Sequence, residues 1–522
     1  MTSPITILDT TLRDGEQSEG ISFTVRDKLR ITQLLDELGV HFIEGGWPGS
    51  NPKAIEYFQA VKKLSLKNAK IAAFSSTRRA KNKVEDDPTI QTLLSVETPV
   101  VVVFGKTWDF HVSHALKISL QENLDLIFDS VEYLKRQGRE VIFDAEHFFD
   151  GYKKNQEYAI QAIQAAQSAG ASILCLCDTN GGSLPSEVSK IVNIVKEKCE
   201  KITIGIHSHN DGGLAVANAI AAVEQGATHI QGTLNGFGER CGNMNLMTMI
   251  PTLVLKMGYA CVSTDQLKQL TQISHHVDEI ANVVHNPFSP YIGRSAFTHK
   301  AGVHVSAILK NPETYEHTSP EFTGNQQRVV VSELSGVSNL IYKAKSFGID
   351  IENPNSPEMA MLVQRLKELE HYGYQFEEAE ASFEILMLKT LKKFNSVINL
   401  ERFRVLNEKS SDNHYNIEAT LKAKIKNKLV HIAAEGNGPV SALDHALRQA
   451  LEKEFPYLNS VQLTDYKVRV LNSKDGTSSV VRVLIQWQDN DKEWGTVGVS
   501  ENIIEASWYA LVDSYEYIIQ KK

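Results

Sequence analysis

The sequence LDTTLRDGEQ, residues 8–17, joins an apolar strand-like run to a cluster of polar side chains. The same order recurs at IHSHND (206–211) and at GFGERCGN (236–243), each after another apolar run. In a parallel α/β barrel the carboxyl ends of all strands open onto one face, so residues distant in sequence become neighbours around one pocket. The three clusters therefore predict a barrel enzyme whose pocket can hold a divalent metal and a carbonyl substrate.

Short β-rich runs alternate with helical segments as far as about residue 260. Nearly continuous apolar runs are typical of parallel strands that are buried on both faces. Thr24, Ser119 and Pro185 are start signals for the helices between them. The alternation predicts a (β/α)8 TIM barrel; an open doubly wound sheet is the alternative, but no GxGxxG follows the first run. The expected strands are ITILDT (5–10), HFIEGG (41–46), KIAAFSS (70–76), PVVVVF (99–104), EVIFDAE (140–146), SILCLCD (172–178), ITIGIHS (202–208) and HIQGTLN (229–235).

Two further regions follow the expected catalytic barrel of residues 1–262. Proline and asparagine breaks separate helical pieces in residues 263–395, which predicts a helical linker and substrate-covering region. Residues 396–522 predict an α+β domain with an internal duplication, because VHIAAEGNGPVSALDHAL (430–447) aligns with WGTVGVSENIIEASWYAL (494–511). By analogy with other small α+β units, this domain is expected to form a dimer contact or an effector site.

Composition and charge exclude several classes of protein. The chain has 522 residues and a net charge of -9, so no general electrostatic attraction to nucleic acid or to anionic membranes is expected. No run reaches the roughly 18 apolar residues of a membrane span, and the first residues do not resemble a signal peptide. The five cysteines contain no CxxC pair. We therefore expect a cytoplasmic protein without structural disulfides.

Two histidines in the HSH sequence supply a candidate metal site. Side chains two residues apart on a strand share a face, so His207 and His209 both point into the predicted barrel mouth. Asp14 follows the first strand and Asn243 follows the eighth, and these strands are neighbours in a closed barrel. Two imidazoles and two oxygen ligands suit Mn²⁺, Mg²⁺, Co²⁺ or Zn²⁺, and ligand type alone does not choose among them. The alternative is that both histidines only pack inside the barrel.

Four further side chains near predicted strand ends are candidates for substrate chemistry. Arg13 can neutralise charge on a carbonyl oxygen, or it can form an ion pair at the barrel rim. Glu146 can orient a water or move a proton, although a solvated glutamate is the plain alternative. The Thr179 hydroxyl can bind a substrate carboxylate, within a sequence that also favours a simple turn. His111 can donate a hydrogen bond to the same substrate.

The polar clusters, together with FTHKAGVH (297–304), resemble the acyl-transferring branch of the metal-dependent barrel enzymes, which includes isopropylmalate, homocitrate and citramalate synthases. The resemblance spans nearly the whole chain, because the duplicated region looks like the effector-binding dimer domain of these enzymes. Chain length and EGGWPGSNPK (44–53) look most like the citramalate synthase subgroup. The lyase branch uses a cysteine in a glycine-rich loop, whereas Cys241 lies within the GERCGN sequence, so a lyase activity is disfavoured.

The resemblance implies a role for each candidate residue. His304 occupies the place of a family histidine that acts on acetyl-CoA, and with Glu146 it is the candidate for proton transfer. A tyrosine that some synthases use near this histidine has no clear counterpart, because Tyr315 aligns poorly. The other implied roles are metal binding for Asp14, His207, His209 and Asn243, and contact with the 2-oxo acid for Arg13, His111 and Thr179, with Arg13 also stabilising the alkoxide.

The resemblance also implies the reaction and its partners. The enolate of acetyl-CoA attacks a 2-oxo acid, and water then hydrolyses the thioester to release CoA. Pyruvate would give citramalate for isoleucine biosynthesis, and 2-oxoisovalerate would give 2-isopropylmalate for leucine biosynthesis. Each additional methyl group changes the free-energy difference between two such acceptors by only about 1 to 3 kcal/mol, so the sequence alone does not choose between them. A homodimer and a branched-chain amino-acid effector are implied as well. A third hypothesis, an amino-acid sensor with an inactive barrel, conflicts with the intact metal, arginine and histidine sets.

Overall fold

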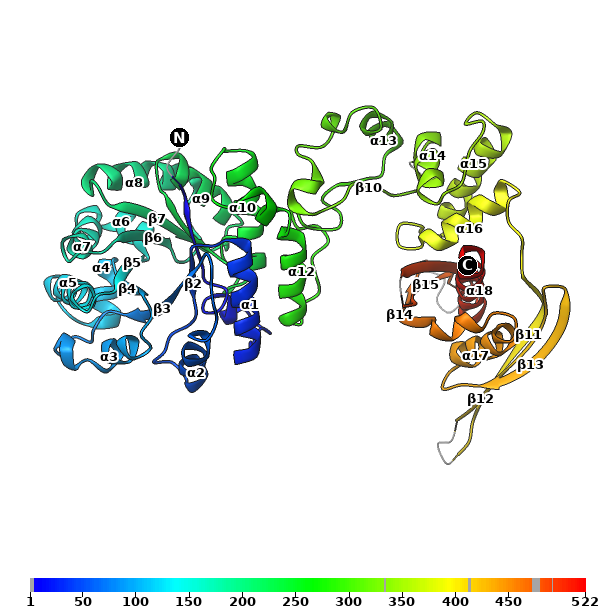
Figure 1. The fold of residues 1–522 in the computed structure, drawn as a ribbon, viewed down its shortest axis with the longest axis horizontal. Coiled ribbons are helices and arrows are strands. Elements are labelled where there is room, and N and C mark those ends of the chain that lie inside the picture. The colour runs from blue at the N-terminus through cyan, green and yellow to red at the C-terminus, as the bar shows by residue number, and fades with distance from the viewer. Residues whose placement is uncertain (1–3, 333–334, 412–414, 472–478, 491) are drawn as a thin grey trace. The chain divides into compact units, whose positions relative to one another are not determined.

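In the computed structural model, the first part of the chain forms a closed barrel of eight parallel strands, drawn from blue to green in Figure 1. The structure describes residues 4–332, 335–411, 415–471, 479–490 and 492–522. Every expected strand has an observed counterpart, which confirms the predicted (β/α)8 barrel. The strands are β1 (Thr6–Asp9), β2 (Phe42–Glu44), β3 (Lys70–Ser76), β4 (Val100–Lys106), β5 (Glu140–Glu146), β6 (Ile173–Asp178), β7 (Thr203–Ser208) and β8 (His229–Gly232).

Local sequence signals define the helices that surround the barrel. The Thr24 hydroxyl accepts a hydrogen bond from the backbone of Asp27, whose carboxylate accepts one from the backbone of Thr24. Ser119 caps its helix in the predicted place, and Pro185 opens another. The helices are α1 (Val25–Leu38), α2 (Pro52–Val61), α3 (Pro88–Ser95), α4 (Asp109–His111), α5 (Leu120–Arg136), α6 (Phe148–Lys154), α7 (Gln156–Ser168), α8 (Pro185–Lys198), α9 (Ala215–Glu224), α10 (Leu246–Leu255), α11 (Thr264–Leu267) and α12 (Leu270–Ile280).

Strand pairing brings the three polar clusters together at one end of the barrel. β1 pairs with β8 so that Leu8 lies opposite Gln231, and β7 pairs with β8 so that His207 also lies opposite Gln231. The loops after β1 and β8 therefore meet the end of β7 at the carboxyl ends of the strands.

The barrel interior changes character along the strands. Leu8, Val102 and Ile142 belong to a buried apolar cluster in its middle. Alternate residues on a strand face the same side, so Asp144 on β5 and Gln231 on β8 also face the interior, nearer its mouth. The apolar layer closes the barrel from below, and the polar side chains lie above it.

The chain divides into two compact units, which are described separately. The first unit contains the residues up to Phe297 together with Thr318–Gln326. This short segment is held by hydrogen bonds, from the Thr271 hydroxyl to the Thr323 carbonyl at 2.7 Å and from the Asn325 amide to the Tyr291 carbonyl at 2.9 Å. The expected domain limits at residues 262 and 395 stay predictions.

The second unit contains Thr298–His317 and the chain from Gln327 onward. It begins with the short strands β9 (Thr298–His299) and β10 (Arg328–Val329), which pair in parallel. Its helices pack around an apolar cluster that includes Leu340, Leu362 and Phe383. The helices are α13 (Gly302–Ile308), α14 (Val337–Ser346), α15 (Pro357–Tyr372) and α16 (Glu380–Thr390).

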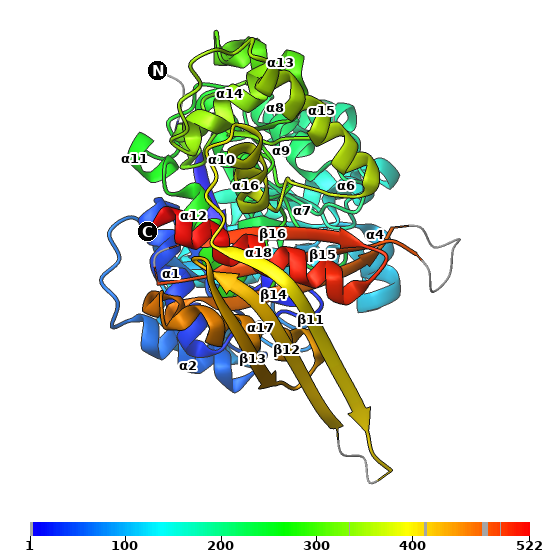
Figure 2. The same ribbon diagram turned by 90° about the vertical axis from the view of Figure 1, so that its right-hand side faces the viewer.

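The predicted duplication is confirmed as two copies of the same arrangement, seen in Figure 2. Each copy is a three-stranded antiparallel sheet followed in the chain by a helix. Ala442 and Ala506, the aligned alanines of the two copies, are both fully buried. The first copy is β11 (Ile398–Lys409), β12 (Tyr415–Ile425), β13 (Lys428–Glu435) and α17 (Pro439–Glu452), and the second is β14 (Gln462–Val470), β15 (Val481–Gln488), β16 (Glu493–Ser500) and α18 (Ile503–Lys521).

Among the residues that the structure describes, none of the helices combines the length and the apolar character needed to cross a lipid bilayer.

Candidate active site

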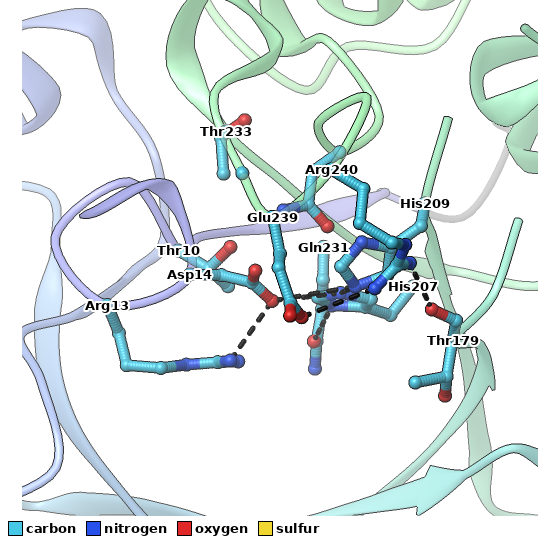
Figure 3. Close-up of polar contacts among 12 residues, drawn as sticks. Thr10, Arg13, Asp14, Thr179, His207, His209, Gln231, Thr233, Glu239 and Arg240 are labelled. Atoms are coloured by element: carbon cyan, nitrogen blue, oxygen red, sulfur yellow. Dashed lines mark hydrogen bonds and ion pairs between the residues drawn. The ribbon is translucent and has the colours of Figure 1, made fainter. Parts of the chain in front are cut away.

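Asp14, His207 and His209 converge at the carboxyl end of the barrel, as Figure 3 shows. Asp14 lies in the loop after β1, and the two histidines lie at the end of β7. The Asp14 Oδ2 atom is 3.4 Å from His207 Nε2 and 3.8 Å from His209 Nε2, and the two Nε2 atoms are 3.4 Å apart. All three side chains are buried. The predicted convergence of one carboxylate and two imidazoles is therefore present.

Burial and neighbouring charges set the protonation of this cluster. Burial opposes charge on Asp14, but Arg13 and His207 hold the pKa of this carboxyl well below its usual range. Burial also disfavours a charged His207, yet its contact with Asp14 outweighs burial and raises its pKa. Burial and the neighbouring His207 lower the pKa of His209 to about 4. Asp14 is therefore an anion that faces two imidazoles in a water-poor site.

The donor atoms at this site fit a divalent cation. Asp14 Oδ1 and Asn243 Oδ1 are buried and have no hydrogen-bond partner within the described protein, and the Nε2 atoms of His207 and His209 both face Asp14. A buried oxygen without a partner is costly unless another group satisfies it. Asn243 is held beside His209 by a β-bridge, and a Cβ atom added at Gly238 would overlap the Asn243 amide, so glycine is needed there. Carboxylate, amide and imidazole donors together match the predicted ligand set.

Arg13 is fixed by contacts on three sides. Its Nε atom donates to Glu44 at 2.6 Å, and its Nη1 atom donates to Asp14 at 3.0 Å. Its guanidinium carbon lies 3.8 Å from the centre of the Phe74 ring. Burial opposes its charge, but the carboxylates of Glu44 and Asp14 outweigh burial and raise the pKa of Arg13, while burial raises the pKa of Glu44 to about 7. Arg13 is therefore a permanent cation with a fixed orientation beside the candidate metal site.

A cavity of about 230 Å³ opens at this end of the barrel. Aromatic rings form one wall of it, with the Phe74 and Phe104 rings stacked 5.3 Å apart and Trp47 packed edge-on against both. This wall limits the size of a substrate that contacts Arg13. The cavity is lined by Arg13, Asp14, Gln17, Trp47, Phe74, Phe104, Asp144, Glu146, Cys177, Thr179, His207, His209 and Glu239.

Glu146 and Thr179 line this cavity, but each already has a protein partner. Glu146 forms an ion pair with Lys106. The Thr179 hydroxyl oxygen accepts a hydrogen bond of 2.8 Å from the backbone N–H of His147. His111 is not among the lining residues; its ring lies edge-on to that of His147, 4.5 Å away, and burial together with His147 lowers its pKa. His111 thus lies beside the group that positions Thr179.

His304 lies in the second unit, on α13, where its ring stacks on that of Tyr315 at 4.1 Å. The resemblance provided no clear counterpart for the tyrosine that some synthases use beside this histidine, because Tyr315 aligns poorly. In the structure Tyr315 nevertheless lies in direct contact with His304. Glu316, the next residue, accepts hydrogen bonds from His299 and Gln327, which fixes the Tyr315 backbone.

Sequence reasoning missed several residues of the site. Glu44 lies at the end of β2 and binds Arg13. Asp144 faces the interior two residues before Glu146, so strand periodicity could have found it. Gln231 bonds to both Asp144 and His207. Arg240, in the loop after β8, bonds to Asp211. It also bonds to the backbone carbonyl of Thr179, as Figure 3 shows.

Three family descriptions match successive parts of the chain. Residues 4–277 match the HMGL-like family, which covers the barrel. Residues 291–373 match the homocitrate synthase post-HMGL domain-like family. Residues 377–519 match the LeuA allosteric (dimerisation) domain, which covers both three-stranded sheets.

Curated relatives match over nearly their full length. The (R)-citramalate synthase of Geobacter sulfurreducens is 55% identical over 99% of this chain and 98% of its own. That of Aquifex aeolicus is 52% identical over 100% of this chain and 99% of its own. The 2-isopropylmalate synthase of Methanocaldococcus jannaschii is more distant, at 31% identity over 99% of this chain and 95% of its own.

Proposed function

The chain belongs to the citramalate synthases of the HMGL-like family, and from this premise we propose that it joins the acetyl group of acetyl-CoA to pyruvate and releases citramalate and CoA. The observation that carries the proposal is the convergence of Arg13, Asp14, His207 and His209 on one cavity. This set can bind and polarise a 2-oxo acid. An intact set also argues against a barrel that only senses amino acids.

Asp14, His207, His209 and Asn243 are the residues that would hold a divalent cation, Mn²⁺, Mg²⁺, Co²⁺ or Zn²⁺. When bound, such an ion supplies Lewis-acid polarisation of the keto group. The two buried oxygen atoms without partners on Asp14 and Asn243 support this assignment. Asp14 carries the negative charge that a cation needs, since its pKa is lowered.

Arg13 is proposed to stabilise the negative charge that develops on the C2 oxygen of pyruvate. Its guanidinium is held by Glu44 and Asp14 before substrate arrives, so little reorganisation is needed during the reaction. Its charge persists at all physiological pH values. The Thr179 hydroxyl accepts a bond from the His147 backbone, which leaves its own proton free to donate to the substrate carboxylate. His111 is proposed to contact the same 2-oxo acid.

His304 or Glu146 is proposed to take a proton from the methyl group of acetyl-CoA. The resulting enolate carbon attacks C2 of pyruvate, so one C–H bond breaks and one C–C bond forms. The alkoxide takes up a proton, and water then hydrolyses the thioester to release CoA. Tyr315, stacked on His304, is in contact with the proposed base. Glu146, the other proposed base, forms an ion pair with Lys106 at the rim of the cavity.

Thiol release from acetyl-CoA tests the proposed reaction directly. Free CoA is measured with pyruvate, 2-oxobutyrate and 2-oxoisovalerate in turn, with and without EDTA. We expect pyruvate to give the highest kcat/KM and EDTA to abolish release until a divalent cation is restored. A preference for 2-oxoisovalerate would make the chain a 2-isopropylmalate synthase, and EDTA-resistant release would remove the metal from the mechanism.

The C-terminal sheets are proposed to build a homodimer that binds a branched-chain amino acid. The match to the LeuA allosteric (dimerisation) domain supports both roles. Isoleucine, leucine and valine are each added to the full chain while CoA release and molar mass are followed. The cysteines within the described ranges form no disulfide, which supports the expected cytoplasmic location.

A further inference from the structure

Gln231 links a buried carboxylate to one of the proposed metal ligands. It lies on β8, faces the barrel interior and is fully buried. Its Nε2 atom donates to Asp144 Oδ1 at 2.8 Å, and its Oε1 atom is 2.8 Å from His207 Nδ1. Figure 3 shows Gln231 directly against His207. No step of the proposed reaction uses either Gln231 or Asp144.

The direction of these hydrogen bonds determines which ring nitrogen of His207 carries a proton. Asp144 Oδ1 accepts a hydrogen bond from the NH₂ group of Gln231. The amide must then turn its oxygen toward His207, and an amide oxygen only accepts. His207 therefore donates through Nδ1, and Nε2, which faces Asp14 and His209, is left as the nitrogen that can bind a cation. A neutral imidazole that binds a cation needs this tautomer.

His209 provides an internal contrast. Its Nδ1 atom is buried and has no hydrogen-bond partner in the described protein. Nothing comparable to Gln231 therefore fixes the His209 ring. If both histidines only packed inside the barrel, apolar side chains could fill the space beside His207. Burying an amide and a carboxylate there costs free energy that simple packing does not require.

We propose that Gln231 and Asp144 are positioning residues of the metal site, which hold His207 in the tautomer and orientation that bind the cation. This inference rests on the proposed function, since it assumes that His207 is a ligand. Loss of a hydrogen-bond partner of this kind typically costs about 10- to 100-fold in metal affinity. The two residues act through His207 and not on the substrate, so KM for pyruvate in saturating metal should change little.

The test measures Mn²⁺ affinity of the metal-free full chain by electron paramagnetic resonance of free Mn²⁺. Gln231→Leu removes both hydrogen bonds, and Asp144→Asn keeps the shape but no longer dictates the orientation of the amide. Asn123→Leu is the matched control, because Asn123 is a buried amide in the same unit with bonds of 2.8 Å to the Lys106 carbonyl and 2.7 Å to the Tyr158 hydroxyl. We expect Kd to rise about 10- to 100-fold in Gln231→Leu, less in Asp144→Asn, and not in the control.

A second readout separates positioning from general destabilisation. The visible absorption bands of the Co²⁺-loaded chain report the geometry around the ion, and they should shift in Gln231→Leu but not in Asn123→Leu. Unchanged Kd and unchanged bands in folded Gln231→Leu would overturn the inference. If Gln231→Leu does not fold, Asp144→Asn decides the question by the same criteria. Wild-type Mn²⁺ affinity in His207→Ala would instead overturn the proposed metal site itself.

Discussion

On β5, Ile142 and Asp144 are two residues apart and face the same barrel interior, yet their surroundings differ completely. Ile142 is fully buried among apolar side chains such as Leu8 and Val102. Asp144 is nearly as buried, but it accepts a hydrogen bond from Gln231. The same change occurs on β2, where Phe42 belongs to the apolar cluster and Glu44 binds Arg13. The interior therefore has an apolar middle layer and, beside the aromatic wall of the cavity, a polar upper layer.

The two layers have different roles: the middle layer stabilises the fold, and the upper layer provides the groups that bind ligands. Apolar burial in the middle layer stabilises the barrel by about 25 cal/mol for each square ångström removed from water. The upper layer buries Asp14, His207 and Glu44, and it leaves several polar atoms without partners, which lowers stability. Such a layer is retained when the groups have a ligand to bind. Substitutions in the two layers should therefore change different observables.

His207→Ala should produce the largest effect on chemistry and a small effect on folding. Loss of a proposed ligand should remove tight metal binding and lower kcat by at least roughly 10⁴-fold. The free energy of unfolding in urea should change by no more than about 1 kcal/mol, because a buried polar group is removed together with its contacts. Metal content by mass spectrometry and CoA release measure the effect, with exposed His114→Ala as the control. A fully active variant would refute the ligand assignment.

Ile142→Ala, in the apolar middle layer, should lower the stability of the fold strongly and change the chemistry little. Truncating a buried isoleucine leaves a cavity that costs about 2 to 5 kcal/mol. Urea unfolding followed by circular dichroism measures this loss. Mn²⁺ affinity and kcat/KM for pyruvate should stay near wild type under conditions where the variant is folded. A large loss of metal affinity in the folded variant would show that the two layers are not independent.

The sequence was sufficient to predict the barrel because each strand is a local apolar run and parallel strands of one barrel must share an orientation. That rule placed Asp14 with His207 and His209 from spacing alone, and the distances in the structure agree. The duplicated C-terminal unit was visible for a similar reason, since Ala442 and Ala506 repeat the same buried position.

Contacts between side chains of different strands were beyond what the sequence could predict. In the sequence, nothing distinguishes Gln231 from other polar residues of a strand. Only the register between strands places it between His207 and Asp144. Glu44 acquires its partner only when β1 and β2 pair. The stacking of His304 on Tyr315 depends on an irregular segment, where no periodic pattern fixes the path of the chain.

Arg13→Lys tests whether geometry in the upper layer matters beyond charge. Lysine keeps the positive charge but loses the planar group that donates to Glu44 and Asp14 together. We expect kcat to fall roughly 10²-fold, equivalent to about 2.7 kcal/mol, with metal content unchanged. Exposed Arg136→Lys serves as the control. An unchanged kcat would mean that Arg13 is only a structural ion pair at the rim.

His229 extends the comparison to the far end of the barrel and to pH. It lies two residues before Gln231 on β8, and its Nδ1 atom is 2.9 Å from the Thr6 hydroxyl. Burial, with smaller effects from His41 and His207, lowers the pKa of His229 from 6.5 to about 3. The unfolded chain then binds a proton that the folded chain does not, so the stability contributed by neutral His229 is present above pH 6.5 and is lost as pH falls toward 3.

His229→Phe should reduce this pH dependence without changing the active site. At pH 5 the wild-type histidine lowers stability by about 2 kcal/mol relative to pH 7, because each pKa unit is equivalent to about 1.4 kcal/mol. The variant keeps a ring of similar size but cannot take up a proton in the unfolded state. Urea unfolding at pH 5 and pH 7 measures the difference between the two proteins. An identical pH slope would show that His229 is already charged in the folded barrel, and the far end of the barrel would then tolerate charge as its mouth does.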